Sequence, residues 1–240
     1  MRENSPMKLL AFDTSTESLS IAVGWQRDGH MAVWQHTAAG GPLASSQLIP
    51  QIQALLAQAG LSLADLDAIA FGAGPGSFTG LRTACAVAQG LAFGVKLPLL
   101  PVDTLMAVAE EARHTTGAQQ VHAVLDARMG EVYAAAYQYD PASMRWQRQA
   151  DIALLAPEAL VVQAGWAVAG NAWAACGERI AASPAQRMDA LPTATALLRL
   201  ASGLLTDGLA VAPDQALPLY IRDKVAKTTD ERAAERAAAS

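Results

Sequence analysis

Residues 71–82 form a glycine-rich segment whose residue types come nearest to a ligand-binding loop. Glycines let a backbone approach a ligand closely, and the free N–H groups of a following helix attract anions. The segment departs from known phosphate-binding and nucleophile patterns: no Gly-Lys-Ser/Thr follows, the third glycine is one residue late for G-x-G-x-x-G, and Ser77 lacks a G-x-S-x-G frame. The residues alone support a tight strand-to-helix turn and a degenerate phosphate loop equally. Such a loop, with the carboxyl of the chain's first turn, would comprise Asp13, Ser15, Gly74, Gly76, Ser77, Thr79 and Gly80.

Asp13 ends a short apolar run and precedes Thr14, Ser15 and Thr16. Its carboxylate has two interpretations, a contact to a nucleotide or an Asx turn closed by its own backbone. We favour the turn, because no second carboxylate is placed to share a Mg²⁺ ion with it.

Other candidate chemical groups are four histidines and a charged turn. No two of the histidines, His30, His36, His114 and His122, stand at i, i+4 on a predicted helix, and no H-E-x-x-H occurs. We therefore expect no metal site, no catalytic residue and histidines that are polar surface or strand residues. The charged residues Arg82, Asp126, Arg128 and Glu131 are assigned to a cleft or to a partner contact, and the sequence leaves both open.

The hydrophobic pattern predicts an α/β protein with two lobes. Strands are expected over 9–12, 19–23, 31–37, 66–71, 97–102, 123–126, 132–139 and 166–169, and helices over 45–59, 79–93, 104–113 and after 170. Asp103 is the expected N-cap of the third helix. A strand that ends in aspartate recurs at Asp13 and Asp126, which suggests duplicated βββαβα units. We divide the chain into an N-terminal lobe (7–102), a C-terminal lobe (103–220) and a solvated tail (221–240).

Residues 29–64 contain no Asp, Glu, Lys or Arg, and the predicted helix over 79–93 contains only Arg82. An ordinary surface helix carries charges on its outer face, and interface cores are depleted of charge. These two helices are therefore predicted to form a docking face for another helical protein, and for a second copy when the chain is alone. The alternative is that both helices are internal. Residues assigned to this docking face are Leu48, Ile52, Leu55, Ala86 and Gln89.

Composition narrows the class further. The net charge is −5, so the chain has no overall attraction for nucleic acid. Cys85 and Cys176 stand in apolar surroundings and are expected to be reduced core thiols. The polar start and the lack of an uninterrupted apolar stretch of about 18 residues predict a cytoplasmic protein without a membrane span.

The run Gly-Pro-Gly-Ser-Phe-Thr-Gly-Leu-Arg at 74–82, followed by Ala-Gln-Gly-Leu-Ala at 88–92, closely resembles the TsaB family, also called YeaZ. Segments 10–17, 126–133 and 218–226 match in the expected order. The resemblance extends from residue 7 to about 226 and is weakest between 140 and 192. One departure is Leu43-Ala44-Ser45-Ser46, where relatives often have a histidine just before the first helix.

The resemblance implies an actin-like ATPase (ASKHA, RNase H-like) fold. It implies a non-catalytic subunit that docks to a TsaD-like catalytic subunit, with a TsaE-like ATPase completing the assembly. The product would be threonylcarbamoyladenosine, beside the anticodon of tRNAs reading codons that begin with A. The tRNA would be reached only through the complex, and no cofactor is expected beyond weak ATP or ADP binding. The alternatives are an independent ATP-binding enzyme of the same fold and a metallopeptidase, against which the missing histidine pair argues.

Overall fold

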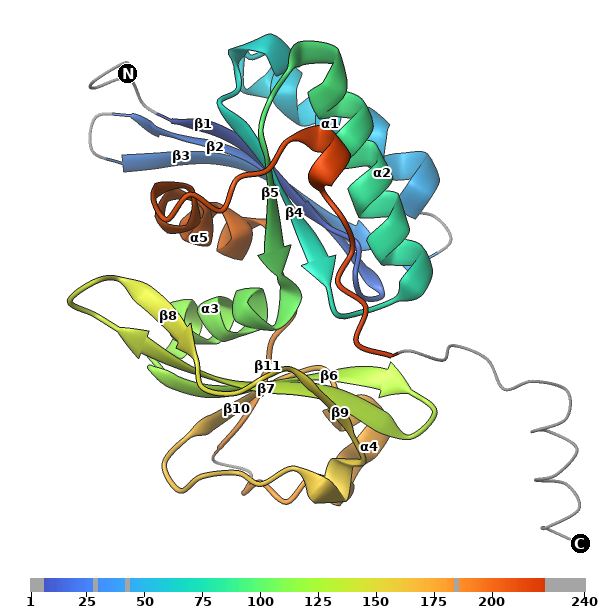
Figure 1. Cartoon of the computed structure of the whole chain (residues 1–240), viewed down its shortest axis with the longest axis vertical. Coiled ribbons are helices and arrows are strands. Elements are labelled where there is room, and N and C mark those ends of the chain that lie inside the picture. Colours follow the sequence, from blue (N-terminus) through green and yellow to red (C-terminus); the bar gives the residue numbers. More distant parts are fainter. Residues whose placement is uncertain (1–6, 28–29, 42–43, 184–185, 223–240) are drawn as a thin grey trace, which may run out of the picture.

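Two separate β-sheets, one in each lobe, organise the structure, a computed structural model that describes residues 7–27, 30–41, 44–183 and 186–222 (Figure 1). The first sheet has the order β3-β2-β1-β4-β5, and the second has the order β11-β10-β6-β7-β8, with β9 paired to β7. The strands of the first sheet are β1 (Lys8–Asp13), β2 (Ser18–Arg27), β3 (His30–Ala39), β4 (Ala68–Gly74) and β5 (Leu99–Asp103). Those of the second are β6 (Gln120–Arg128), β7 (Glu131–Asp140), β8 (Arg145–Arg148), β9 (Ala153–Leu155), β10 (Ala167–Gly170) and β11 (Arg187–Asp189).

The two sheets share one topology. In each, the first strand (β1 or β6) pairs antiparallel with the second and parallel with the fourth, and the fifth strand is parallel to the fourth. Each unit ends in a helix, α3 (Thr104–Thr116) after β5 and α5 (Ala194–Thr206) after β11. This confirms the predicted duplication and places Asp13 and Asp126 at equivalent strand ends.

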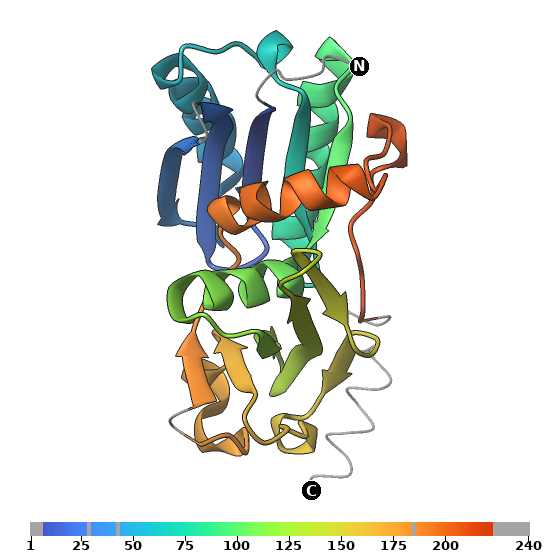
Figure 2. The ribbon, with the colours of Figure 1, turned by 90° about the vertical axis from the view of Figure 1, so that its left-hand side faces the viewer.

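The helices cover the first sheet on both faces. Leu10 and Phe12 of β1 point into a core shared with α1 (Ala44–Gln58) and α2 (Phe78–Val95), whereas Leu9 and Ala11 point into a second core with α5. Figure 2 shows α5 crossing this second face, with α3 directly below it. Residues alternate in direction along a strand, so a central strand covered on both sides is apolar throughout.

Helix α3 packs on the second sheet, where Leu105, Val108 and Ala112 join the core around Tyr137. Its predicted N-cap is confirmed, because Asp103 Oδ1 accepts hydrogen bonds from the backbone N–H groups of Leu105 (2.9 Å) and Met106 (3.4 Å). The remaining short helices are α4 (Trp173–Cys176), η2 (Leu63–Asp65), η3 (Pro157–Ala159), η4 (Gly177–Arg179) and η6 (Pro213–Gln215).

The chain's end does not follow the division at residues 102 and 103. Helix α5 belongs by packing to the first sheet, although it follows the C-terminal lobe in sequence. Beyond it, Val211 bridges to Leu99, and residues 216–222 run back between the lobes. Of the predicted tail, Ile221 and Arg222 are described and pack on the second lobe, and residues 223–240 lie outside the described part. The prediction that a solvated tail begins at residue 221 is therefore wrong for Ile221 and Arg222, which pack on the second lobe.

Both cysteines are buried and free, as predicted. Within the described ranges, no helix has the length and hydropathy needed to cross a bilayer.

Candidate functional site

A cleft of about 350 Å³ lies between the lobes, where the predicted loop and the charged turn face each other. The first lobe contributes Ser15 to Glu17 and Gly76 to Phe78, and the second contributes Asp126 to Met129 and Asn171. The structure therefore brings Ser15, Gly76, Ser77, Asp126 and Arg128 to one cavity. Asp13, Thr79 and Glu131 do not line it.

The glycine-rich loop is packed against the turn after β1. Ser77 N–H donates to Ser15 O (2.7 Å), and Thr14 Oγ1 donates to Gly80 O (2.7 Å). A Cβ at Gly80 would lie 1.8 Å from Thr14 O, so only glycine permits this approach. The Ser77 hydroxyl caps α2 by accepting from Gly80 N–H. The loop's close contacts thus support the tight-turn interpretation and leave Thr79 exposed on the first turn of α2.

Asp13 forms the predicted Asx turn. Its Oδ1 accepts hydrogen bonds from Ser15 N–H (2.8 Å) and Ser15 Oγ–H (2.6 Å). Its Oδ2 is buried with no hydrogen-bond partner among the described residues, and a Cβ at Gly72 would lie 1.7 Å from this oxygen. Burial raises the pKa of Asp13 to about 6, against the opposing effect of the Ser15 hydrogen bonds. The carboxyl is directed at the backbone of β4 and away from the cleft.

The charged turn bridges the two lobes. Arg128 contacts Asp126 within its own turn (3.0 Å) and Glu17 of the first lobe (3.6 Å). Asn171 Nδ2 donates to Glu17 Oε1 (3.2 Å), and Asn171 Oδ1 accepts from Asp126 N–H (3.0 Å). Among the described contacts, Glu131 forms its ion pair with Arg222 and not with Arg128 of the same turn. The turn is therefore used for holding the lobes together, and the Arg128 side chain remains largely exposed.

Residues 216–222, here called the C-terminal strap, close one side of the cleft (Figure 1). In the first lobe, Ala216 O accepts from Gln89 Nε2 (3.1 Å), and Leu219 N–H donates to Ala73 O (2.7 Å). In the second lobe, Arg222 pairs with Glu131 (2.7 Å) and donates to Ala127 O (3.1 Å).

Tyr220 of the strap contacts Arg82 and Phe78 at the start of α2. The Arg82 guanidinium lies 3.6 Å from the Phe78 ring centroid, and Arg82 Nε donates to Tyr220 Oη (3.1 Å). Leu219 O lies where a Cβ on Gly74 would come within 2.6 Å, and Gly74 has φ of 123°. Gly74 therefore makes room for the strap. Sequence reasoning found this segment only through its resemblance to the family.

A buried carboxylate fixes α5 to α3 on another side of the lobe boundary. Glu110 accepts hydrogen bonds from Arg113 Nε (2.9 Å), Arg199 Nε (2.9 Å) and Trp146 Nε1 (3.0 Å). Burial alone would raise the pKa of Glu110, but the hydrogen bonds from Arg113 and Trp146 and the nearby arginine charges hold it below its usual value. This cluster could not be predicted from the sequence, because its members come from α3, β8 and α5 and meet only in the fold.

The predicted docking face is wrong for three of its five residues. Leu48, Ile52 and Leu55 are 0%, 1% and 3% exposed, because they form the face of α1 that packs on the first sheet. Ala86 is exposed, and Gln89 is half-buried and bonded to the strap. The outer surface of these helices instead consists of Ser45, Ser46, Ile49, Pro50, Gln53, Ala54, Ala57 and Gln58 on α1, and of Thr79, Arg82, Ala86, Gly90, Phe93 and Gly94 on α2. Phe93 is 79% exposed.

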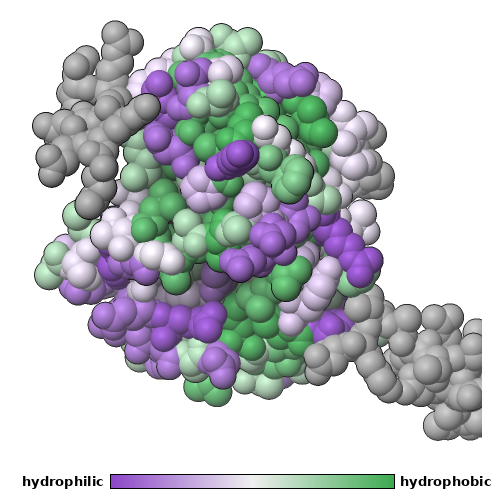
Figure 3. All heavy atoms as spheres, turned by 45° about the horizontal axis from the view of Figure 1, so that its top comes forward, coloured by the Kyte–Doolittle hydropathy of each residue, from purple (hydrophilic) through white to green (hydrophobic). Residues whose placement is uncertain are grey.

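Hydrophilic and hydrophobic areas are interspersed over the face shown in Figure 3. The described part of the chain holds no group of three or more His, Cys, Asp or Glu side chains placed to bind a metal. His114 is exposed, His36 is half-buried, and the side chain of His30 lies outside the described ones. His122 is a buried residue of strand β6; burial lowers its pKa, and its Nε2 contacts Gln163 Oε1.

Known proteins of one family are similar to this chain over most of its length. The family model described as "TsaD: tRNA N6-adenosine threonylcarbamoyltransferase" matches residues 43–237. An Escherichia coli (strain K12) protein named "tRNA threonylcarbamoyladenosine biosynthesis protein TsaB" is 38% identical over 92% of this chain and 96% of its own length. Its namesake from Haemophilus influenzae is 33% identical over 91% of this chain and 95% of its own length. The solved structure "YeaZ from Pseudomonas aeruginosa" superposes with a TM-score of 0.81 at 39% identity, covering 90% of this chain and 100% of that one.

Proposed function

The chain belongs to the TsaB (YeaZ) family, and on that premise we propose that it serves tRNA threonylcarbamoyladenosine synthesis as a non-catalytic subunit. In this proposal it docks onto a TsaD-like catalytic subunit in the cytoplasm, and a TsaE-like ATPase joins the assembly. The modified adenosine lies beside the anticodon of tRNAs that read codons beginning with A. The observation that carries the proposal is the uncharged outer surface of α1 and α2.

The exposed surface of these two helices has the chemistry of an interface core. Every residue of α1 is uncharged, and Arg82 is the single charged residue of α2. Phe93 and Ile49 present apolar side chains to solvent, and Gly90 and Gly94 have open space above them. Exposed apolar patches mark association sites in soluble proteins, and small residues allow two helices to approach closely.

The partner is argued from the family match. The TsaD model covers α1, α2 and almost everything after them in this chain. A protein of that family can therefore present an equivalent pair of helices, which permits helix-on-helix packing of two related surfaces. A second copy of this chain presents the same pair. We infer that self-association and partner binding use one face and compete.

We assign no chemistry to the chain itself. The charged side chains that line the cleft already have partners: Glu17 contacts Arg128 and Asn171, and Arg222 pairs with Glu131, which lies outside the lining. Glu110, which is buried like Asp13, is paired with Arg113 and Arg199. No nucleophile with an adjacent base, the usual arrangement for covalent catalysis, occurs among these contacts.

ATP or ADP is expected to bind weakly at most. The loop that would hold phosphates already bonds to the turn after β1, and the strap lines the same cleft. A dissociation constant for ATP below about 10 μM, which corresponds to about 7 kcal/mol, would favour the alternative of an ATP-binding enzyme.

The test is reconstitution with the organism's TsaD-like and TsaE-like proteins. The isolated chain should yield no threonylcarbamoyladenosine from threonylcarbamoyl-adenylate and tRNA, and the complete set should yield it. Turnover by the single protein would contradict the non-catalytic assignment.

Two variants address docking itself. Ala86→Arg and Phe93→Glu change exposed residues, so the fold should persist. A charge buried without a partner costs several kcal/mol, so both variants should lose self-association in light scattering and the TsaD-like partner in pull-down. Ala142→Arg and Val161→Glu are matched exposed controls in the other lobe. Retention of both associations by both folded variants would remove this face from the proposal.

A further inference from the structure

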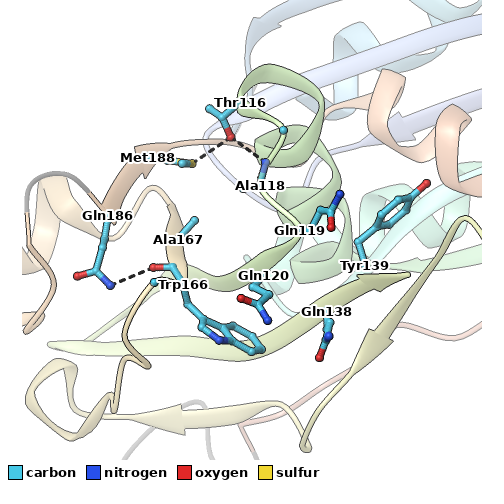
Figure 4. A pocket seen from close by; sticks show the side chains of 12 residues that line it. Thr116, Ala118, Gln119, Gln120, Gln138, Tyr139, Trp166, Ala167, Gln186 and Met188 are labelled. Carbon is cyan, nitrogen blue, oxygen red and sulfur yellow. Dashed lines mark hydrogen bonds between the residues drawn. The ribbon is translucent and has the colours of Figure 1, made fainter. Parts of the chain in front are cut away.

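A second cavity, of about 560 Å³, opens in the C-terminal lobe and shares no lining residue with the interlobe cleft (Figure 4). None of its 12 lining residues is charged, and four of them are glutamines. Volumes of this size are usual for small-molecule sites, which combine apolar walls with a few convergent polar groups.

Three side chains form a row across neighbouring strands at this cavity. Gln120 of β6 pairs with Gln138 of β7. Ala167 of β10 pairs with Val121 of β6, so Trp166, directly before Ala167, comes beside Gln120. Paired residues point to the same face of a sheet, with strands about 4.8 Å apart. Figure 4 shows the Trp166 indole beside the carboxamides of Gln120 and Gln138.

The Trp166 ring has a buried aromatic neighbour, whereas the two carboxamides are uncommitted. The Trp166 ring lies 5.1 Å, between centroids, from the ring of buried His122. Trp166 O accepts a hydrogen bond from Gln186 Nε2 (3.0 Å). Among the described residues, the side chains of Gln120 and Gln138 have no hydrogen-bond partner. The result is an aromatic ring packed against one buried neighbour, beside exposed carboxamides that are free to donate and accept.

We propose that this cavity binds a nucleobase, with the ring on Trp166 and its edge against Gln120 and Gln138. A carboxamide presents a donor and an acceptor side by side, which matches the edge of a base such as adenine. Aromatic side chains bind unstacked bases by stacking. A site of this kind deepens the proposed function, because it would give RNA a contact on this chain.

Electrostatics separate this site from one that grips phosphate. The lining is uncharged. The nearby Arg113 lies 4.3 Å from the Tyr139 ring centroid and is paired with Glu110. The base alone is therefore recognised, and its source is either a free nucleoside or an unpaired base in an RNA loop.

The experiment titrates adenosine into the isolated, ¹⁵N-labelled full chain and follows side-chain amide and indole signals by NMR. Saturable shifts are expected for Gln120, Gln138 and Trp166. Trp166→Ala should weaken binding about tenfold, in line with the stacking contribution of one base, and Trp166→Phe should retain part of the affinity. Gln120→Ala should also weaken binding, whereas Gln53→Ala, an exposed glutamine on α1, should not.

Two comparisons define the ligand chemistry. ATP should bind no more tightly than adenosine, and raising the salt from about 50 to 200 mM should leave the affinity unchanged, since phosphate contacts would make it fall steeply. An RNA hairpin with an unpaired loop is compared with a fully paired duplex. Hairpin binding that is lost in Gln120→Ala assigns the site to RNA, and adenosine binding without hairpin binding assigns it to a nucleoside.

Three results would overturn the proposal. They are no shift of the cavity signals at millimolar adenosine, an equal response to acetamide, and shifts that persist unchanged in Gln120→Ala. Because the measurement uses the chain without its partner, its outcome is independent of whether α1 and α2 dock to a TsaD-like protein.

Discussion

The buried carboxyl of Asp13 should make the free energy of unfolding depend on pH by a predictable amount. Its pKa is raised by burial to about 6 in the folded chain, from an ordinary value of 3.8. Ionising Asp13 therefore costs more in the folded than in the unfolded state, and the free energy of unfolding falls as pH rises from about 4 to about 6. The shift of about 2 pH units corresponds to about 3 kcal/mol.

Asp13→Asn isolates this effect. The asparagine Oδ1 can still accept the two hydrogen bonds from Ser15, which preserves the turn. Urea unfolding of both proteins at pH 4, 5, 6 and 7 gives the difference in free energy of unfolding, variant minus wild type. We expect this difference to rise by about 2 kcal/mol from pH 4 to pH 7, because the unfolded-state carboxyl is already partly ionised at pH 4.

Asp140→Asn is the control with the opposite sign. Hydrogen bonds from Ser143 and Ala142 N–H lower the pKa of the half-buried Asp140, so its carboxylate stabilises the fold as pH rises. The same difference should therefore fall slightly between pH 4 and pH 7. A flat profile for Asp13→Asn would mean that Asp13 titrates alike in both states, and would refute the buried, half-partnered carboxyl.

Four further substitutions test the contacts around the cleft. Gly80→Ala should destabilise the chain by several kcal/mol in urea unfolding, because the new Cβ would meet Thr14 O. Gly90→Ala has open space for its Cβ and should stabilise the chain by up to about 1 kcal/mol. Similar effects of the two substitutions would contradict the loop packing. Glu110→Gln should cost about 3 kcal/mol by leaving Arg113 without its anion and Arg199 with Glu111 alone, and a cost below about 1 kcal/mol would show that solvent replaces the carboxylate. Arg222→Ala should speed amide hydrogen exchange in the strap with a stability loss under about 1 kcal/mol, since its partner Glu131 is partly exposed; unchanged exchange would mean that Leu219 and Tyr220 hold the strap without it.

Sequence patterns predicted the local features whose causes are local. The Asx turn at Asp13 and the N-cap at Asp103 each depend on a side chain and the backbone two or three residues away. The helical spacing of Leu48, Ile52 and Leu55 correctly marked one face of α1, but that face is the core of the first lobe. An apolar stripe shows which side of a helix is buried, and the docking surface had to be sought on the opposite side.

Features decided by distant contacts could not be predicted in this way. The amphipathic pattern of α5 predicts a buried face but does not show which apolar surface covers that face. In the fold, the face packs on the first sheet. The strap has no helical or strand-like hydrophobic periodicity to mark it in the sequence. Its path is set by contacts with Ala73, Ala127 and Glu131, which lie far from it in the chain. The row of Trp166, Gln120 and Gln138 depends on strand register, which places residues from three parts of the chain side by side.

Several groups of contacts among the described residues join the lobes, and this arrangement bears on what the chain can do. Glu17 meets Arg128 and Asn171 on one side of the cleft, the strap connects Ala73 to Ala127 on another, and Glu110 binds Arg199 beneath α5. A nucleotide-driven clamp needs a hinge whose two states differ in their contacts with the ligand. In this chain, the contacts between the lobes that such a hinge would have to break are made by the chain's own side chains and backbone, without a ligand. Because α1 and α2 both pack on the first sheet, the orientation of the proposed docking surface is set within the first lobe and needs no nucleotide-driven closure.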